Sequence, residues 1–149
     1  MSIATIADAG VIARLEDATS DGVFDMEVSG RADESAGEPV RISGTVRNRI
    51  ERSGQLWISV SFGQGNVLVI SPYLVQIMEP LTLVEIGLDP AAFEVIAIKS
   101  RVHFRRGFDD SGFAKTILLV EPTEPFLGTV RLDALRYESI DLTKFYPFG

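Results

Sequence analysis

The sequence QLWISVSFGQGNVLVIS, residues 55–71, contains two apolar runs joined by Gly63-Gln64-Gly65-Asn66. Glycine and asparagine at this spacing favour a tight turn between antiparallel strands. The stretch therefore predicts a β-hairpin with strands over 55–62 and 66–71. The uncharged run from Gly54 to Met78 has the length of a membrane-spanning helix, which needs about 20 apolar residues, but the internal turn excludes one.

Upstream of the hairpin, the side chains also alternate with a period of two. Val40 to Ile50 places apolar residues opposite Arg, Ser and Thr, which predicts a long strand with a basic outer face. Phe24 to Val28 predicts a shorter strand, and Arg31 to Pro39 a polar loop. Nearer the N-terminus, the apolar residues from Ile3 to Ala18 recur at near-helical spacing and predict one amphipathic helix.

Downstream of Pro80, short apolar runs replace the alternation. Leu81 to Ile86 and Phe93 to Ile98 predict strands that are buried on both faces. Asp89-Pro90 between them predicts a short helical turn through Ala91 and Ala92. The remaining elements expected are a helix over 101–108 capped by Ser100, a strand from Lys115 to Val120, and an irregular tail from Glu121 that wraps the body.

These elements define an α+β fold class, with a mixed, mainly antiparallel sheet and a parallel β-α-β unit in the second half of the chain. The sequence has 149 residues, 46% of them hydrophobic. A chain of this size buries a sufficient core by itself, and no linker or repeat divides it. We therefore expect one domain over residues 1–149.

Composition excludes several classes of site. The chain has no Cys and one His, so it holds no disulfide, no thiolate metal site and no His-rich zinc site, and we expect no metal ligands within it. The cytoplasm is the simplest compartment for such a chain, since no secretory signal precedes residue 10. A net charge of −7 argues against nucleic acid as a partner. We expect no membrane partner either.

One basic window stands out against this acidic total. Residues 99–106, KSRVHFRR, contain four cationic side chains and no acid, whereas residues 54–98 contain four acids and no base. If Val95 to Ile98 is a parallel strand, Lys99 and Ser100 lie at its carboxyl end, where a following helix start attracts anions. His103 and Arg105 would add donors. A basic helix that pairs with the acidic first 40 residues explains the same pattern, and an isolated His is more often structural than catalytic.

The window also resembles a known family signature. Gly87-Leu88-Asp89-Pro90 followed by Lys99-Ser100, His103, Phe104 and Arg105 is similar to the G-[IL]-D-P … K-S-x-x-H-F-R pattern of the C-terminal domain of microcystinase C (MlrC)-type metallopeptidases. Shorter matches support it at Gly30–Pro39, Val69–Ser71 and Arg136-Tyr137 before Tyr146-Pro147. The resemblance extends from about Ile6 to Pro147.

The resemblance implies a substrate-binding domain of a zinc-dependent peptidase or amidohydrolase. Relatives carry their zinc in a larger N-terminal domain, which this chain lacks. The resemblance therefore makes that domain an expected partner. It also implies that this chain does not hydrolyse substrate by itself. The resemblance assigns His103 a catalytic role, as a hydrogen-bond donor or proton shuttle. It assigns Lys99, Ser100, Phe104 and Arg105 to binding a peptide or a small anionic substrate.

Two other functions remain open. The first is a non-enzymatic module that binds a small anionic ligand through the same residues. The second is a structural or homo-oligomerisation domain, with the hairpin 55–71 or the aromatic tail at the subunit interface. The outer face of the hairpin carries Trp57, Ser59 and Ser61. These residues could form a docking surface for a partner, and coverage by the C-terminal tail explains them equally well.

Overall fold

A computed structural model describes residues 1–30, 37–100 and 102–120. The chain divides into two compact units, Met1–Lys115 and Thr116–Gly149. Of the second unit, residues 116–120 are described. The expected irregular tail lies outside the described residues, as does most of the polar loop at 31–39, and the single-domain assignment stays a prediction.

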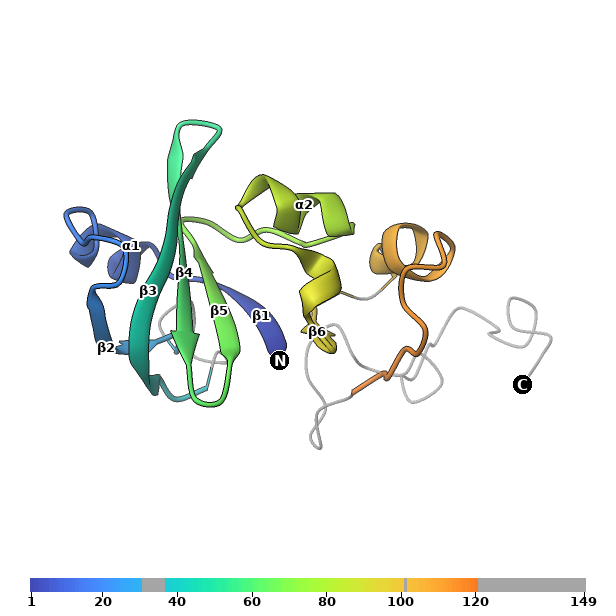
Figure 1. The fold of residues 1–149 in the computed structure, drawn as a ribbon, viewed down its shortest axis with the longest axis horizontal. Helices are drawn as coiled ribbons and strands as arrows, with labels where there is room; N and C mark the ends of the chain where they lie inside the picture. The colour runs from blue at the N-terminus through green and yellow to red at the C-terminus, as the bar shows by residue number, and fades with distance from the viewer. Residues whose placement is uncertain (31–36, 101, 121–149) are drawn as a thin grey trace, which may run out of the picture. The chain divides into compact units, whose positions relative to one another are not determined.

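The first unit is built on a six-stranded sheet of order β2-β3-β4-β5-β1-β6 (Figure 1). Its strands are β1 (Ser2–Ala7), β2 (Val23–Val28), β3 (Val40–Arg52), β4 (Gln55–Phe62), β5 (Asn66–Ser71) and β6 (Val95–Ala97). Strands β2 to β5 pair antiparallel, whereas β1 pairs parallel with both β5 and β6. The α+β class and the mixed, mainly antiparallel sheet are therefore confirmed, as is the hairpin over 55–71.

The helical elements are short. They comprise α1 (Ala9–Arg14), α2 (Pro80–Glu85), the 3-10 turn η1 (Pro90–Ala92) and a π-helical turn η2 (Arg105–Asp109). The turn η1 begins where Asp89-Pro90 predicts it, and the Asp89 carboxylate accepts a hydrogen bond from the Ala91 N–H at 3.0 Å. No helix in the described part of the chain is long and apolar enough to cross a membrane.

The prediction of one helix from Ile3 to Ala18 is wrong in its first half. Residues 2–7 form strand β1, which lies between β5 and β6, and Ile3 pairs with both Val67 and Ile96. The helical spacing is real from Asp8 onward, since that residue caps α1. Pairing on both sides of β1 outweighs the weak helical pattern of Ile3 to Ala7, because strand formation depends on neighbours distant in sequence.

Three predictions downstream are also wrong in detail. Leu81 to Ile86 is not a buried strand, because Pro80 starts α2, which buries Leu83 and exposes Leu81 and Val84. Lys115 to Val120 forms no strand, and Leu118, Leu119 and Val120 are exposed. Ser100 caps no helix: η2 begins after Phe104. The parallel β-α-β unit is formed instead by β5, α2 and β6, with β1 between its two strands.

The sheet is covered on both faces. One face packs with α1 into a core that contains Val11, Leu15, Phe24, Ile58, Val60 and Ile70. On the other face, Trp57 is 1% exposed, lies near Ile86 and stacks edge-on with Tyr73 at 6.0 Å. Trp57 is therefore no open docking surface, since the segment that contains α2 covers it. Figure 1 shows α1 and α2 on opposite sides of β3 to β5.

A β-bulge in β3 lets one strand serve both faces. Val46 pairs with Val60 but Asn48 pairs with Ser59, so one extra residue reverses the side-chain direction between them. Val46 joins the core beside α1, whereas the Asn48 amide donates to the Gly87 carbonyl beyond α2 at 3.0 Å. The bulge thus attaches the end of the α2 segment to the sheet.

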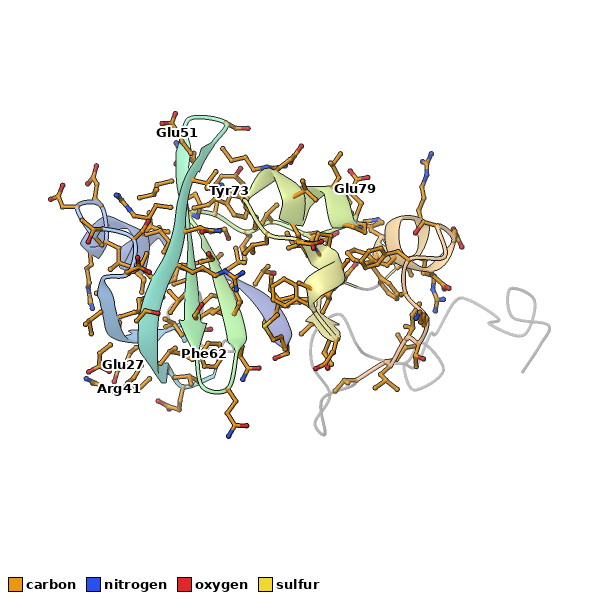
Figure 2. All side chains as sticks on the ribbon, in the orientation of Figure 1. Glu27, Arg41, Glu51, Phe62, Tyr73 and Glu79 are labelled. Atoms are coloured by element: carbon orange, nitrogen blue, oxygen red, sulfur yellow. The ribbon has the colours of Figure 1, made fainter. Side chains whose placement is uncertain are left out.

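The outer face of β2 and β3 carries an ion pair that predicts a measurable pKa shift. Asp25 accepts two hydrogen bonds from Arg41, at 3.0 and 2.7 Å, and one from Ser43. These bonds, the Arg41 bonds first, hold the pKa of the Asp25 carboxyl below its ordinary value of 3.8. Arg41 lies near the start of β3, and its side chain is 65% exposed (Figure 2).

We expect the pKa of Asp25 to rise when Arg41 is replaced by methionine, as read from carboxyl chemical shifts in an NMR titration. Because the folded-state pKa is lowered, the pair stabilises the fold above the ordinary carboxyl range and loses this effect as the pH falls through the folded-state pKa. The stability difference between Arg41→Met and the unmodified chain should therefore shrink toward pH 2. An unchanged Asp25 titration in Arg41→Met would contradict the assignment.

Candidate functional site

The parallel part of the sheet places three strand ends at one edge. Because β5, β1 and β6 run in the same direction, their carboxyl ends lie on the same side of the sheet. The last residues of these strands are Ser71, Ala7 and Ala97. Ligands of sheets with parallel strands commonly bind beyond the carboxyl ends. The segment that leaves β6 there contains Lys99, Ser100, His103 and Phe104, four of the five site residues that the sequence singles out.

Asp8, at the end of β1, has a structural role in this region. Its side chain is 8% exposed and accepts hydrogen bonds from the backbone N–H groups of Val11 at 3.0 Å and Ser29 at 3.1 Å. The Asp8 N–H in turn donates to the Ser71 carbonyl at 3.0 Å. Asp8 therefore caps α1 and joins the ends of β1 and β5. An acidic residue before the first helical turn is a sequence signal that could have placed the start of α1.

Lys99 and Ser100 follow β6 directly. Lys99 is exposed, and Ser100 is half-buried. The Ser100 Oγ atom is itself shielded from solvent and has no hydrogen-bond partner among the described residues. A buried hydroxyl without a partner costs about 1–3 kcal/mol, so a ligand that reaches this atom and supplies a partner would be favoured.

His103 contacts a residue that the sequence did not single out. Its Nδ1 lies 2.8 Å from the Oε1 atom of Gln76, on the segment between β5 and α2. Tyr73 and Glu79, labelled in Figure 2, lie on either side of Gln76 in that segment. The contact brings together the two segments that leave β5 and β6. No sequence signal pairs residues 27 positions apart in irregular segments.

Phe104 and Arg105 begin the π-helical turn η2. Phe104 is 7% exposed and anchors the turn, and the Arg105 guanidinium lies 5.4 Å from the centre of its ring. Arg105 also donates to the Asp109 carboxylate at 3.0 Å, an i,i+4 pair that its spacing could have predicted. This stacking joins two of the five predicted site residues.

Gly107 allows η2 to lie directly against the chain before α2. A Cβ atom at Gly107 would lie 2.1 Å from the Met78 carbonyl oxygen and 2.7 Å from the Glu79 Cα atom. Glycine is therefore required by close backbone packing. This packing holds His103 and Gln76 in reach of each other.

The described residues do not provide a metal site. Among them, no group of three His, Asp or Glu side chains is arranged to hold an ion. The donor set of a zinc peptidase, three protein ligands and an open position, therefore does not fit the part of the chain that the structure describes.

These features define an α+β domain whose mixed sheet places a basic, His-containing segment beyond the ends of its parallel strands. Residues 1–123 match the family model described as MlrC C-terminus. The chain therefore belongs to the MlrC C-terminal domain family, as the sequence resemblance predicts. No curated protein matches the chain.

A solved structure shares the fold. A candidate metallopeptidase from Mesorhizobium sp. BNC1 superposes with a TM-score of 0.63 and 15% sequence identity, over 74% of this chain and 25% of that chain. The chain thus spans about a quarter of the length of that structure. The likeness establishes a shared fold.

Proposed function

We propose that this domain completes the substrate site of an MlrC-type metallopeptidase that hydrolyses amide bonds. In this proposal, residues 99–105 bind a carboxylate of a peptide or small anionic substrate, or the oxyanion that develops during hydrolysis. The observation that carries the proposal is the shielded Ser100 hydroxyl, which has no hydrogen-bond partner among the described residues, next to the exposed Lys99 at the end of a parallel strand.

Each residue has a separate role in this proposal. Lys99 supplies a positive charge, and Arg105 keeps most of its five N–H donors for a substrate while Asp109 and the Phe104 ring orient its guanidinium. Ser100 donates its hydroxyl to the same anion. His103 donates a hydrogen bond or moves a proton.

The zinc of such an enzyme would be held by the larger N-terminal domain, because the described residues here do not fit a metal site. Zinc would polarise the scissile carbonyl or activate water. This domain would contribute charge and shape on the opposite side of the substrate. The proposal therefore requires the larger domain as its partner.

Arg105→Ala in a full-length protein that contains this domain should lower kcat/KM by about tenfold to a hundredfold, the effect of losing one charge-assisted hydrogen bond to the transition state. Arg106→Ala is the matched control, because it removes the neighbouring exposed cation. Circular dichroism should show both variants folded. Equal kcat/KM in the two variants would refute a role for Arg105.

The same Ser100 hydroxyl also favours a module that binds a small anion without catalysis. Titration of the 149-residue chain with acetate or phosphate, followed by NMR, tests this second function. Saturable shifts that disappear in Lys99→Ala, together with unchanged hydrolysis in Arg105→Ala, would favour the module over the enzyme. If the titration shows no anion binding and Arg105→Ala leaves hydrolysis unchanged, a structural or oligomerisation role would remain.

A further inference from the structure

We propose that Gln76 is a positioning residue that holds the proton of His103 on Nδ1 and so leaves Nε2 as the acceptor that faces a substrate. The juxtaposition behind this proposal is the 2.8 Å contact between His103 Nδ1 and Gln76 Oε1. The inference rests on the proposed function for the use of Nε2. Its first part, the location of the proton, concerns the chain by itself.

The chemistry of the two groups decides the direction of the hydrogen bond. An amide oxygen has lone pairs and no proton, so Oε1 can only accept. With Oε1 as the Gln76 atom that faces the ring, Nδ1 carries the proton that joins the two side chains. In the neutral imidazole the second nitrogen, Nε2, then has a lone pair and no proton.

Exposed hydrogen bonds are usually weak, but this one joins two side chains whose neighbours are fixed. Ile77, next to Gln76, is 2% exposed, and Phe104, next to His103, is 7% exposed. Gly107, which has no side chain, also allows the backbone of η2 to pack directly against Met78 and Glu79. Because both backbones are anchored, the pair loses side-chain rotamer freedom but little backbone freedom when it forms.

This arrangement suits proton transfer in amide hydrolysis. Nε2 can take one proton from an attacking water and return it to the leaving nitrogen. During the interval the ring is positively charged, and the Gln76 oxygen continues to accept from Nδ1–H. Second partners of this kind orient catalytic imidazoles in many enzymes. Gln76 would thus act through His103 and would not touch substrate.

The single His of the chain allows a direct test. Nitrogen-15 NMR of the 149-residue chain at about pH 9, where imidazole rings are neutral, reports which ring nitrogen carries the proton. We expect Nδ1–H to predominate. Gln76→Met should shift the ratio of the two tautomers by about threefold to tenfold toward Nε2–H, the effect of losing one hydrogen bond.

Two further variants complete the experiment. Gln64→Met, at the exposed turn between β4 and β5, makes the same substitution away from His103 and should leave the ratio unchanged. Gln76→Glu keeps an acceptor oxygen and should retain Nδ1–H. A predominant Nε2–H tautomer in the unmodified chain, or an equal ratio in Gln76→Met, would overturn the inference.

Activity separates this inference from the proposed function. In the full-length protein, Gln76→Met should lower kcat/KM and Gln76→Glu should restore part of it. If His103→Ala leaves kcat/KM unchanged, the proposed function of His103 fails, while the tautomer measurement still decides the role of Gln76. If His103→Ala abolishes activity and Gln76→Met leaves it unchanged, Gln76 is not a positioning residue.

Discussion

Gly44→Ala should destabilise the domain by about 3 kcal/mol, at the upper end of what overpacking a core costs. Gly44 lies in the middle of β3, between Phe24 on β2 and Phe62 on β4. A Cβ atom there would lie 2.0 Å from the Ser61 carbonyl oxygen and 3.1 Å from the Phe62 Cβ atom. The neighbour is backbone of a central strand, so it cannot rotate away.

Urea denaturation measures the effect as a lower midpoint with an unchanged slope. Gly10→Ala is the matched control, because a Cβ atom there meets Asp8 Oδ1 at 3.4 Å, an ordinary contact. In α1 this substitution should raise the stability by about 0.5 kcal/mol, since alanine favours the helix over glycine. Equal midpoints for Gly44→Ala and the unmodified chain would show that β3 and β4 can separate without cost.

The contrast between these two glycines illustrates what the sequence could predict. The alternation in residues 40–62 identifies β3 and β4 because their side chains face the core on one side, a local property. Gly44 interrupts the apolar residues Ile42 and Val46 on the same face, but the sequence does not say that the Phe24 and Phe62 rings flank the gap. The register of the neighbouring strands β2 and β4 decides which residues lie beside Gly44. This register depends on contacts between residues that are distant in the sequence.

The sequence does not predict strand β1 either, because this strand also depends on pairing with partners distant in the sequence. Residues 3–7 lack a strong pattern, and they become a strand because β5 and β6 offer hydrogen bonds on both sides. The sequence predicts a strand at 81–86, where the structure has a helix, because four apolar residues in six fit a buried strand as well as a helix. Pro80 at the first helical turn was the signal that favours the helix.

The sequence predicts which residues form a candidate site, but it does not predict the contacts that they make. The basic window and the family resemblance identify Lys99 to Arg105 as one group. The structure adds that Arg105 pairs with Asp109 and His103 with Gln76. The first pair follows from helical spacing, whereas the second depends on how two irregular segments pack, which no periodicity encodes.

Gly107→Ala is the substitution that should disturb the site most. The added methyl group would meet the Met78 carbonyl oxygen at 2.1 Å, so η2 must move away from residues 78–79. We expect a loss of about 2–3 kcal/mol in stability. We also expect the His103–Gln76 hydrogen bond to break, because the displaced segment carries Phe104 and His103 with it.

Hydrogen exchange and imidazole NMR measure the two effects separately. In the unmodified chain the Asp110 N–H donates to the Arg105 carbonyl at 2.8 Å, and the Ala114 N–H to the Phe108 carbonyl at 2.7 Å. Both amides should lose protection in Gly107→Ala.

The His103 tautomers should become mixed, as we also expect for Gln76→Met. Gly112→Ala is the control within the same segment. Gly112 has a φ of +73° and no atom within 4 Å of an added Cβ, so alanine there costs only backbone strain, about 1–2 kcal/mol. It should therefore destabilise the domain and leave the tautomer on Nδ1. A mixed tautomer in both variants would mean that any loss of stability disturbs His103, and that close packing at Gly107 has no specific role in holding the pair.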